Sequence, residues 1–377
     1  MKASLSVPLS VCAAALCFSA PSTLARERWT EAEARAWQDR VPWMVGGNFL
    51  PSTAINQLEM WQEDTFDPGT IDRELGWAAQ LGFTSLRVFL HDLPWRDDPA
   101  GFLHRIEKFL SLAYRHGIGI MFVVLDGCWD PRPRSGRQHP PRPHVHNSGW
   151  VQSPGAAILG DPSRHAEVRD YVYGVIHHFR NDCRIQAWDL FNEPENDNRN
   201  SYGANGANIE LRNKADMALR LLEQAFRWAQ LADPSQPLTA GLWMGPWPEG
   251  TRLSPIEQLM IAQSDVISFH NYGPLDQVKL RVEQLRRYGR PILCTEYMSR
   301  PAGSTFDPIL GYLKEQRVAA YNWGFVAGKS QTIYPWDSWQ KTYTAEPPVW
   351  FHDLLRPDGT PFDAKEAEYI RRVTHKR

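Results

Sequence analysis

The sequence predicts an α/β protein that folds as a single (β/α)8 barrel. Short apolar runs alternate with segments of helical periodicity, and eight such units fit within the 377 residues. The runs are continuously apolar, as expected for parallel strands buried on both faces. An open, doubly wound sheet is the alternative, but no glycine-rich phosphate loop follows the first run.

The predicted strands are short, apolar and rich in β-branched and aromatic residues. They cover residues 41–49, 85–90, 119–126, 185–192, 237–243, 265–271, 291–296 and 318–325.

The predicted helices lie between these strands and after the last one. Asp67-Pro68 is typical of their starts, because it places a capping carboxylate before a proline that suits the first helical turn. Gly82 and Gly117 mark helix ends that turn into the next strand. The helices cover residues 67–82, 98–117, 161–182, 209–233, 254–263, 274–289, 305–316 and 363–373.

Two connections, 127–160 and 193–208, are too long for simple turns. Both follow the carboxyl ends of predicted strands, which is where a barrel of this kind builds its functional site. We therefore expect both loops to border the site.

Residues 1–25 have the pattern of a secretory signal peptide. Lys2 precedes an apolar stretch over 5–20, and Thr23-Leu24-Ala25 offers a small-residue cleavage site. We expect a secreted or periplasmic protein whose mature chain, 26–377, is one domain. No later stretch reaches the ~18 apolar residues of a membrane span, so we expect no membrane insertion.

Three cysteines, Cys128, Cys183 and Cys294, follow the predicted signal peptide, so at most one disulfide can form within the mature chain. The formal net charge is −2, which disfavours nucleic acid as a partner and is compatible with a neutral substrate. The 16 tryptophans suit sugar binding, because the indole ring stacks on the C–H face of a pyranose, although many will simply pack in the core.

Two predicted strands end on carboxylates. Asn192-Glu193-Pro194 closes strand 185–192, and Glu296 closes strand 291–296. Pro194 disfavours a helical conformation at Glu193, so we expect an extended backbone there. In barrel order the two carboxylates come from the fourth and seventh strands and face each other across the mouth, which is the arrangement that glycosidic bond cleavage requires.

This pattern resembles the retaining glycoside hydrolases of the 4/7 barrel superfamily, clan A, and within it glycoside hydrolase family 5, over roughly residues 41–375. The resemblance implies that Glu193 is the general acid/base and Glu296 the nucleophile. It further implies roles for five residues that lie on the predicted strands or directly after them. They are Arg87 (contact to the nucleophile), Asn192 (sugar 2-OH), His270 and Tyr272 (a pair of which Tyr272 touches the nucleophile) and Trp323 (sugar platform).

Elementary electrostatics supports these roles. Arg87 should lower the pKa of Glu296, and burial beside a second carboxylate should raise the pKa of Glu193. We expect the carboxyl groups to be about 5–5.5 Å apart, the retaining separation. Glu195 is a runner-up acid, but its place after Pro194 makes it less well positioned.

Further residues in long loops at the mouth are candidate sugar contacts, with packing as the equal alternative. Asn48 and Trp61 belong to the first strand and its loop, and His144, Asn147 and Trp150 belong to loop 127–160. His139, His144 and His146 have no cysteine or carboxylate at ligand spacing, so we predict no metal site, and we expect no cofactor.

The resemblance favours hydrolysis of β-linked oligosaccharides, with β-1,4 mannosides or glucosides first, and loop 127–160 favours a pocket over an open groove. Three alternatives remain. They are an endo-acting β-1,4-glycanase of cellulase, mannanase or xylanase type, a catalytically silent carbohydrate-binding barrel, and a metal-dependent barrel hydrolase.

Overall fold

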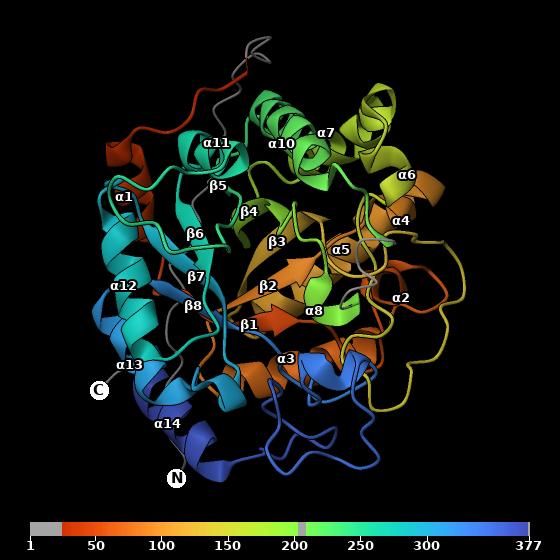
Figure 1. Cartoon of the computed structure of the whole chain (residues 1–377), viewed down its shortest axis with the longest axis vertical. Helices are drawn as coiled ribbons and strands as arrows, with labels where there is room; N and C mark the ends of the chain where they lie inside the picture. Colours follow the sequence, from red (N-terminus) through yellow and green to blue (C-terminus); the bar gives the residue numbers. More distant parts are fainter. Residues whose placement is uncertain (1–24, 203–208, 376–377) are drawn as a thin grey trace.

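The computed structural model describes residues 25–202 and 209–375, and its strands form one parallel barrel (Figure 1). Apart from Ala25, the predicted signal peptide lies outside the described residues. The strands pair in the order β5-β4-β3-β2-β1-β8-β7-β6. They are Val45–Phe49 (β1), Ser85–Phe89 (β2), Gly119–Asp126 (β3), Ile185–Asn192 (β4), Leu238–Thr239 (β5), Ile267–His270 (β6), Ile292–Tyr297 (β7) and Ala319–Asn322 (β8).

The predicted barrel is confirmed, and each predicted strand is present. Strand β5 is much shorter than the predicted 237–243. The barrel still closes beyond it, because Leu242 pairs with Phe269 in a parallel bridge and its N–H donates to the Ser268 carbonyl at 2.9 Å.

Helices surround the strands on the outside of the barrel (Figure 1). Each predicted helix is present, although segment 161–182 divides into a 3-10 turn followed by an α-helix. These elements are Pro68–Gln80 (α3), Pro99–Arg115 (α5), Pro162–Val168 (η1), Arg169–His178 (α7), Lys214–Leu231 (α10), Pro255–Gln263 (α11), Leu275–Arg286 (α12), Phe306–Glu315 (α13) and Ala364–Thr374 (α14). None of the helices among the described residues combines the length and apolar character of a membrane span.

The predicted capping is also present. The Asp67 side chain accepts from the Thr70 N–H at the start of α3, and Pro68 occupies the first turn. Gly82 adopts a φ of +78° after the helix, a conformation that a side chain would disfavour.

Several short elements were not predicted. Most lie in loops on the side of the strands' carboxyl ends, where too few residues repeat to show a period. They are Glu31–Arg40 (α1), Gln57–Trp61 (α2), Asp92–Asp97 (α4), Ala156–Leu159 (α6), Arg199–Tyr202 (α8), Arg300–Ala302 (η3) and Trp336–Trp339 (η4).

Helix α1 was missed because its sequence is mostly polar, and only Ala34 and Trp37 are buried. These two side chains join a small cluster with barrel residues such as Met121 and Leu293. Thr30 and Glu33 form a capping box at its start. The helix therefore owes its place to this tertiary contact and its cap rather than to a long apolar stripe.

The main core lies between the strands and the outer helices, and Trp61 belongs to it. The Trp61 side chain is fully buried against the rings of Phe102 and Phe109, at centroid distances of 5.9 and 5.6 Å. Its indole N–H donates to the Phe89 carbonyl at 2.7 Å. The prediction that Trp61 contacts sugar is therefore wrong, because α2 turns this residue inward under the loop.

We expect Trp61→Ala to lower the free energy of unfolding by about 3–5 kcal/mol, because it removes a large, fully packed side chain. Chemical denaturation would measure this change. Tyr114→Ala is the control, since Tyr114 is 50% exposed and should change stability by no more than about 0.5 kcal/mol. Equal effects of the two substitutions would contradict the core placement of Trp61.

Candidate active site

Strand register brings the predicted residues together at the carboxyl ends of the strands. Asn48 on β1 pairs with Arg87 on β2, and His270 on β6 pairs with Glu296 on β7. Because neighbouring parallel strands end at the same edge, these side chains converge on one point.

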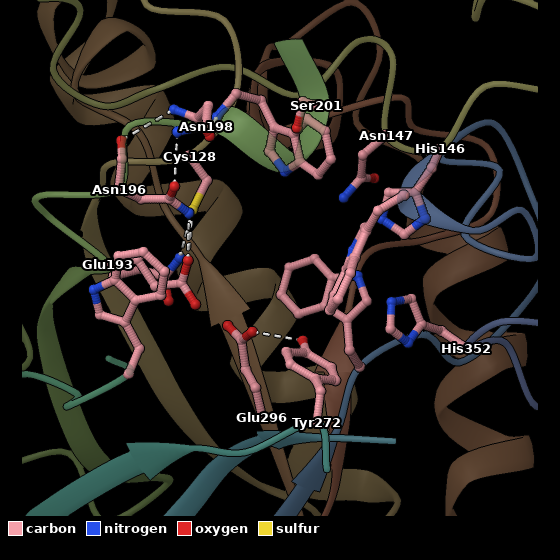
Figure 2. Close-up of a pocket in the computed structure, with 15 residues that line it drawn as sticks. Cys128, His146, Asn147, Glu193, Asn196, Asn198, Ser201, Tyr272, Glu296 and His352 are labelled. Carbon is pink, nitrogen blue, oxygen red and sulfur yellow. Dashed lines mark hydrogen bonds between the residues drawn. The ribbon is translucent and has the colours of Figure 1, made fainter. Parts of the chain in front are cut away.

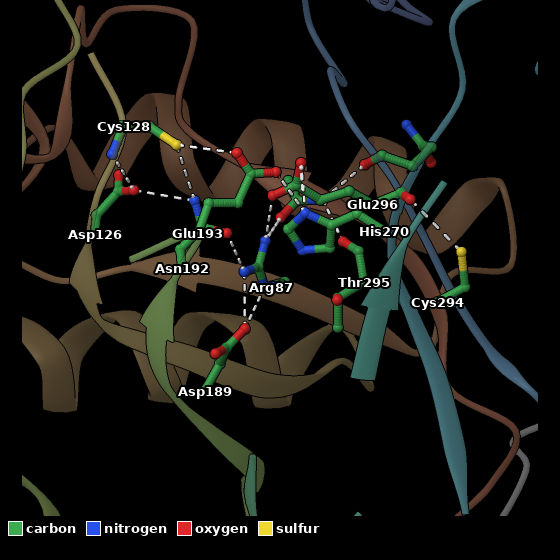
Figure 3. A network of polar contacts seen from close by, with 12 residues as sticks. Arg87, Asp126, Cys128, Asp189, Asn192, Glu193, His270, Cys294, Thr295 and Glu296 are labelled. Atoms are coloured by element: carbon green, nitrogen blue, oxygen red, sulfur yellow. Dashed lines mark hydrogen bonds and ion pairs between the residues drawn. The ribbon is translucent and has the colours of Figure 1, made fainter. Parts of the chain in front are cut away.

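The Arg87 guanidinium lies at the centre of this group and is fully buried (Figure 3). One amino group donates to Glu296 Oε1 at 2.8 Å, and the other donates to Asp189 Oδ2 at 2.7 Å. A buried cation is tolerated only when its partners compensate its lost hydration, and Arg87 has two carboxylates for this purpose. Asp189, within β4, was not singled out in the sequence, where it reads as part of an apolar run.

Two amides complete the Arg87 contacts. The side-chain oxygens of Asn48 and Asn192 accept from Arg87 at 2.8 and 2.7 Å. Asn48 also donates to the Thr295 carbonyl at 2.9 Å and does not line the pocket described below. Asn48 is therefore a support for Arg87 that borders a neighbouring cavity, and its sugar contact stays a prediction, whereas Asn192 lines the pocket.

Asn192 is oriented from its other side by Asp126, a second residue that sequence reasoning missed. Its amide donates to Asp126 Oδ1 at 3.0 Å, and the Trp150 indole N–H donates to Asp126 Oδ2 at 2.6 Å. Burial raises the pKa of Asp126 to about 6. The Asp126 carboxyl thus ties the end of β4 to loop 127–160.

The Glu193 carboxyl group makes hydrogen-bond contacts with three side chains. His270 Nδ1 lies 2.7 Å from Oε1, while Asn196 Nδ2 and the Cys128 thiol donate to Oε2 at 2.6 and 3.4 Å (Figures 2 and 3). The backbone at Glu193 has a φ of +41°, so the predicted extended conformation is wrong. Pro194 disfavours the right-handed helical region, and the chain turns through the left-handed region instead, a strained choice that the surrounding contacts hold.

Glu296 lies opposite Glu193 and is held independently. The Tyr272 hydroxyl donates to Glu296 Oε2 at 2.7 Å, opposite the Arg87 contact to Oε1. One carboxyl oxygen of Glu193, one of Glu296 and a ring nitrogen of His270 all lie within 4.8 Å of one another. The two carboxyl groups are therefore close neighbours that receive different partners.

Burial dominates the protonation of this site. It raises the pKa of Glu193, and the Asn196 and Cys128 hydrogen bonds oppose that rise. It also raises the pKa of Glu296, so the predicted net lowering is not observed, although the nearby His270 and Arg87 oppose the rise. Burial lowers the pKa of His270 to about 4, so its imidazole is neutral at pH 7.

These residues border a pocket at the mouth of the barrel (Figure 2). The predicted residues Asn192, Glu193, Tyr272, Glu296 and Trp323 all line it, and so does Asn147. The sequence analysis missed other lining residues, although some lie in the two loops expected at the mouth. These are Cys128, Trp129, His146, Asn196, Asn198, Ser201 and His352. Trp243 and Trp336, for which the sequence indicates outer subsites after the fifth and eighth strands, also line the pocket.

Two predicted contacts lie behind the wall of this pocket. Trp150 is buried, and its ring packs edge-on against Phe89 and Trp323 at 5.1 and 5.7 Å. The Nδ1 atom of His144 lies 2.7 Å from the Tyr343 carbonyl oxygen, at hydrogen-bond distance. Neither lines this pocket, but Trp150 borders a neighbouring cavity together with Asn147 and Trp323.

The buried side chain of Lys214 holds the loop that carries Glu193 in place by hydrogen bonds. Lys214 at the start of α10 donates to the carbonyls of Gly127 and Asn196, both at 2.6 Å, and pairs with Glu210 at 3.0 Å. The lysine thereby joins loops 127–160 and 193–208 at their bases. Glu195, the runner-up acid, has a pKa raised to about 7 by burial but does not line the pocket.

Comparison with known proteins gives a consistent result at the level of fold. No model of a known protein family matches the sequence, and no curated protein matches it significantly. Among solved structures, the chain is similar to a β-1,4-mannanase from Aplysia kurodai, with a TM-score of 0.52 and 15% identity over 74% of this chain and 87% of that one.

Two further solved structures are similar. The first is an endo-1,4-β-D-mannanase from Thermotoga petrophila, with a TM-score of 0.51 and 16% identity over 88% of this chain and 99% of that one. The second is an exo-β-1,4-mannosidase from Opitutaceae bacterium strain TAV5, with a TM-score of 0.56 and 18% identity over 88% of this chain and 59% of that one. At such identities the likeness establishes a shared barrel fold.

We expect Asn196→Ala to raise the pKa of Glu193 further, because it removes a hydrogen bond that stabilises the charged carboxylate. A carbon-13 NMR titration of the glutamate carboxyls would measure the shift, with the Glu193 signal assigned from Glu193→Gln. The control is Asn213→Ala, at an exposed position whose side chain makes no capping bond. A lowered or unchanged pKa in Asn196→Ala would refute the assigned role of this contact.

Proposed function

We propose that the protein is a retaining β-glycoside hydrolase of the family 5 type that acts on β-1,4-linked mannosides. The observation that carries this proposal is the pairing of Glu193 and Glu296 at the ends of β4 and β7, with one oxygen of each within 4.8 Å. That proximity suits the retaining separation of about 5–5.5 Å and not the 6.5–9.5 Å that leaves room for a water in inverting enzymes.

In the first step the Glu296 carboxylate attacks the anomeric carbon, and the bond to the leaving oxygen breaks. Arg87 and Tyr272 hold the two oxygens of Glu296, which keeps the attacking carboxylate charged and aimed. Glu193, whose pKa is raised by burial, donates its proton to the leaving oxygen. The product of this step is a glycosyl ester on Glu296 and a Glu193 carboxylate.

In the second step a water attacks the anomeric carbon and gives a proton to Glu193, and the ester bond to Glu296 breaks. Neutral His270 contacts Glu193 at 2.7 Å and Glu296 at 3.5 Å, so it can share its single proton with either carboxyl as their charges exchange. Two displacements at one carbon return the original β configuration.

The mannoside assignment draws support from the names of the similar structures, which are mannanases and a mannosidase. The loops support a pocket closed on one side over an open groove, because loop 127–160 packs against the segment after β8. The Trp129 and Trp339 rings stack at 5.6 Å, and the Trp339 indole donates to the His146 carbonyl at 2.7 Å. This wall on one side of the carboxylates favours short oligosaccharides or chain ends over internal cleavage of polymers. We further propose, from residues 1–25, that the enzyme is exported.

A metal-dependent hydrolase is the second candidate, because Glu193, His270 and Glu296 are close enough to bind one cation. The Arg87 amino group 2.8 Å from Glu296 Oε1 opposes it, since a cation would face a guanidinium at the same carboxylate. Activity that survives exhaustive dialysis against EDTA would support the proposed enzyme, and activity restored only by added Zn²⁺ or Mn²⁺ would support the metal.

Azide should separate the roles of the two carboxylates. We expect Glu193→Ala to lose about 10²–10⁴-fold in activity, because the general acid/base is removed. Azide should restore turnover of an activated aryl β-mannoside and give β-mannosyl azide, since it attacks the ester on Glu296 without needing a base.

In Glu296→Ala, azide should instead attack the anomeric carbon directly and give α-mannosyl azide. NMR of the products distinguishes the two anomers. Full activity of Glu296→Ala without azide would refute the proposed mechanism, and the same anomer from both variants would refute the division of roles. A wild-type protein that binds mannooligosaccharides but cleaves none would favour the silent binding barrel.

A further inference from the structure

We propose that His146, Asn147 and His352 form a subsite that binds hydroxyl groups of the sugar on the non-leaving side of the cleaved bond. This inference rests on the proposed function and adds to it the residues that read the sugar. All three side chains line the pocket, and Figure 2 shows them on the side of the pocket opposite Glu193. The leaving oxygen must lie beside its proton donor Glu193, so the opposite side receives the retained sugar.

The protonation of both imidazoles is set by the backbone. His146 Nδ1 lies 2.7 Å from the Tyr334 carbonyl, and His352 Nδ1 lies 2.5 Å from the Met298 carbonyl. A carbonyl oxygen only accepts, so Nδ1 carries the hydrogen in each ring. Burial lowers the pKa of His146 to about 4 and that of His352 well below its usual range, so both rings are neutral. Each Nε2 is therefore a hydrogen-bond acceptor.

These acceptors have no partner within the described part of the chain. His146 and His352 are fully buried, and neither Nε2 meets a donor there. Asn147 is 1% exposed, and its amide oxygen and nitrogen are also without partners among the described residues. Buried polar atoms in native proteins are normally paired, so three side chains that line one pocket and each leave a buried polar atom without a partner point to a ligand.

The chemistry of the group selects neutral hydroxyls. Two acceptors beside an amide suit O–H donors, and the absence of a positive charge on either imidazole gives an anionic sugar nothing to pair with. The rings of Trp129 and Trp336 lie 5.5 and 5.8 Å from His146 and His352. Such indoles next to fixed polar groups match the alternating C–H faces and hydroxyl edges of a pyranose.

The subsite is built rigidly from two distant loops. The His146 N–H donates to Ser338 Oγ at 3.0 Å, and the Asn147 N–H donates to the Ser330 carbonyl at 2.8 Å. The His352 ring lies 5.4 Å from the ring of Tyr272, which holds Glu296. The proposed subsite therefore lies directly beside the residue that holds Glu296. A pair of histidines could also bind a metal, but no third cysteine, histidine or carboxylate of the described residues joins them.

The test compares variants that remove the Nε2 acceptor of each histidine with variants that supply another acceptor in its place. His352→Phe and His146→Phe keep a ring but lose Nε2, whereas His352→Gln and His146→Gln can still accept through the amide oxygen. We expect each Phe variant to raise KM for β-1,4-mannobiose and its aryl glycoside about tenfold with little change in kcat, as the loss of one good hydrogen bond predicts. The Gln variants should recover part of this loss.

His139→Phe is the matched control. His139 lies in the same loop, and its Nδ1 contacts the Pro140 carbonyl at 2.8 Å, but its side chain is exposed outside the pocket. Its KM should remain that of the wild type. Deoxyfluoro mannosides, which lack one O–H donor each, should identify the hydroxyl, because its removal should cost the wild type binding and cost the matching Phe variant little.

Calorimetric binding of mannobiose and mannotriose to Glu296→Ala separates this inference from the proposed function. If the wild type cleaves mannosides but the Phe variants keep wild-type KM and affinity, the subsite is refuted and the function stands. If no glycoside is cleaved but binding weakens in the Phe variants and not in His139→Phe, the function is refuted and the subsite stands. Stoichiometric Zn²⁺ binding that is lost in the Phe variants would replace the sugar subsite with a metal site.

Discussion

The buried Arg87 guanidinium is the interaction on which the rest of the site depends. It is fully buried in the middle of β2 and contacts carboxylates or amides on β1, β4 and β7. Its positive charge stabilises the buried carboxyl groups of Asp189 and Glu296, and they in turn make its burial tolerable. Loss of the cation would leave two buried carboxyl groups at the barrel mouth without the positive charge that now contacts both of them.

From this centre the paired carboxyls of Glu193 and Glu296 acquire different environments. Glu296 contacts Arg87 and Tyr272, whereas Glu193 contacts neutral partners, namely His270, Asn196 and the Cys128 thiol. Burial raises the pKa of both groups, but only Glu296 has a cation in direct contact. One carboxyl is thereby suited to stay charged and attack, and the other to hold a proton and release it.

The loops supply what the strands cannot. Lys214 ties the bases of loops 127–160 and 193–208 together, and loop 127–160 packs against the segment that follows β8. These contacts place aromatic rings and neutral acceptors around the carboxylates on one side. The barrel thus provides a rigid centre of buried charges, while the loops shape the pocket around it.

The sequence by itself determined the barrel, its strands and most of its helices, because hydrophobic period, Asp-Pro starts and terminal glycines are local signals. It also placed Glu193 and Glu296 at strand ends, since strand ends are readable from where an apolar run stops, and the family resemblance added Arg87, His270 and Tyr272. Only the tertiary structure decided that Trp61 is core, that Asn48 supports Arg87, that Glu193 has a positive φ, and that His352 joins His146. Those outcomes depend on contacts between segments far apart in the chain, whose direction no local pattern records.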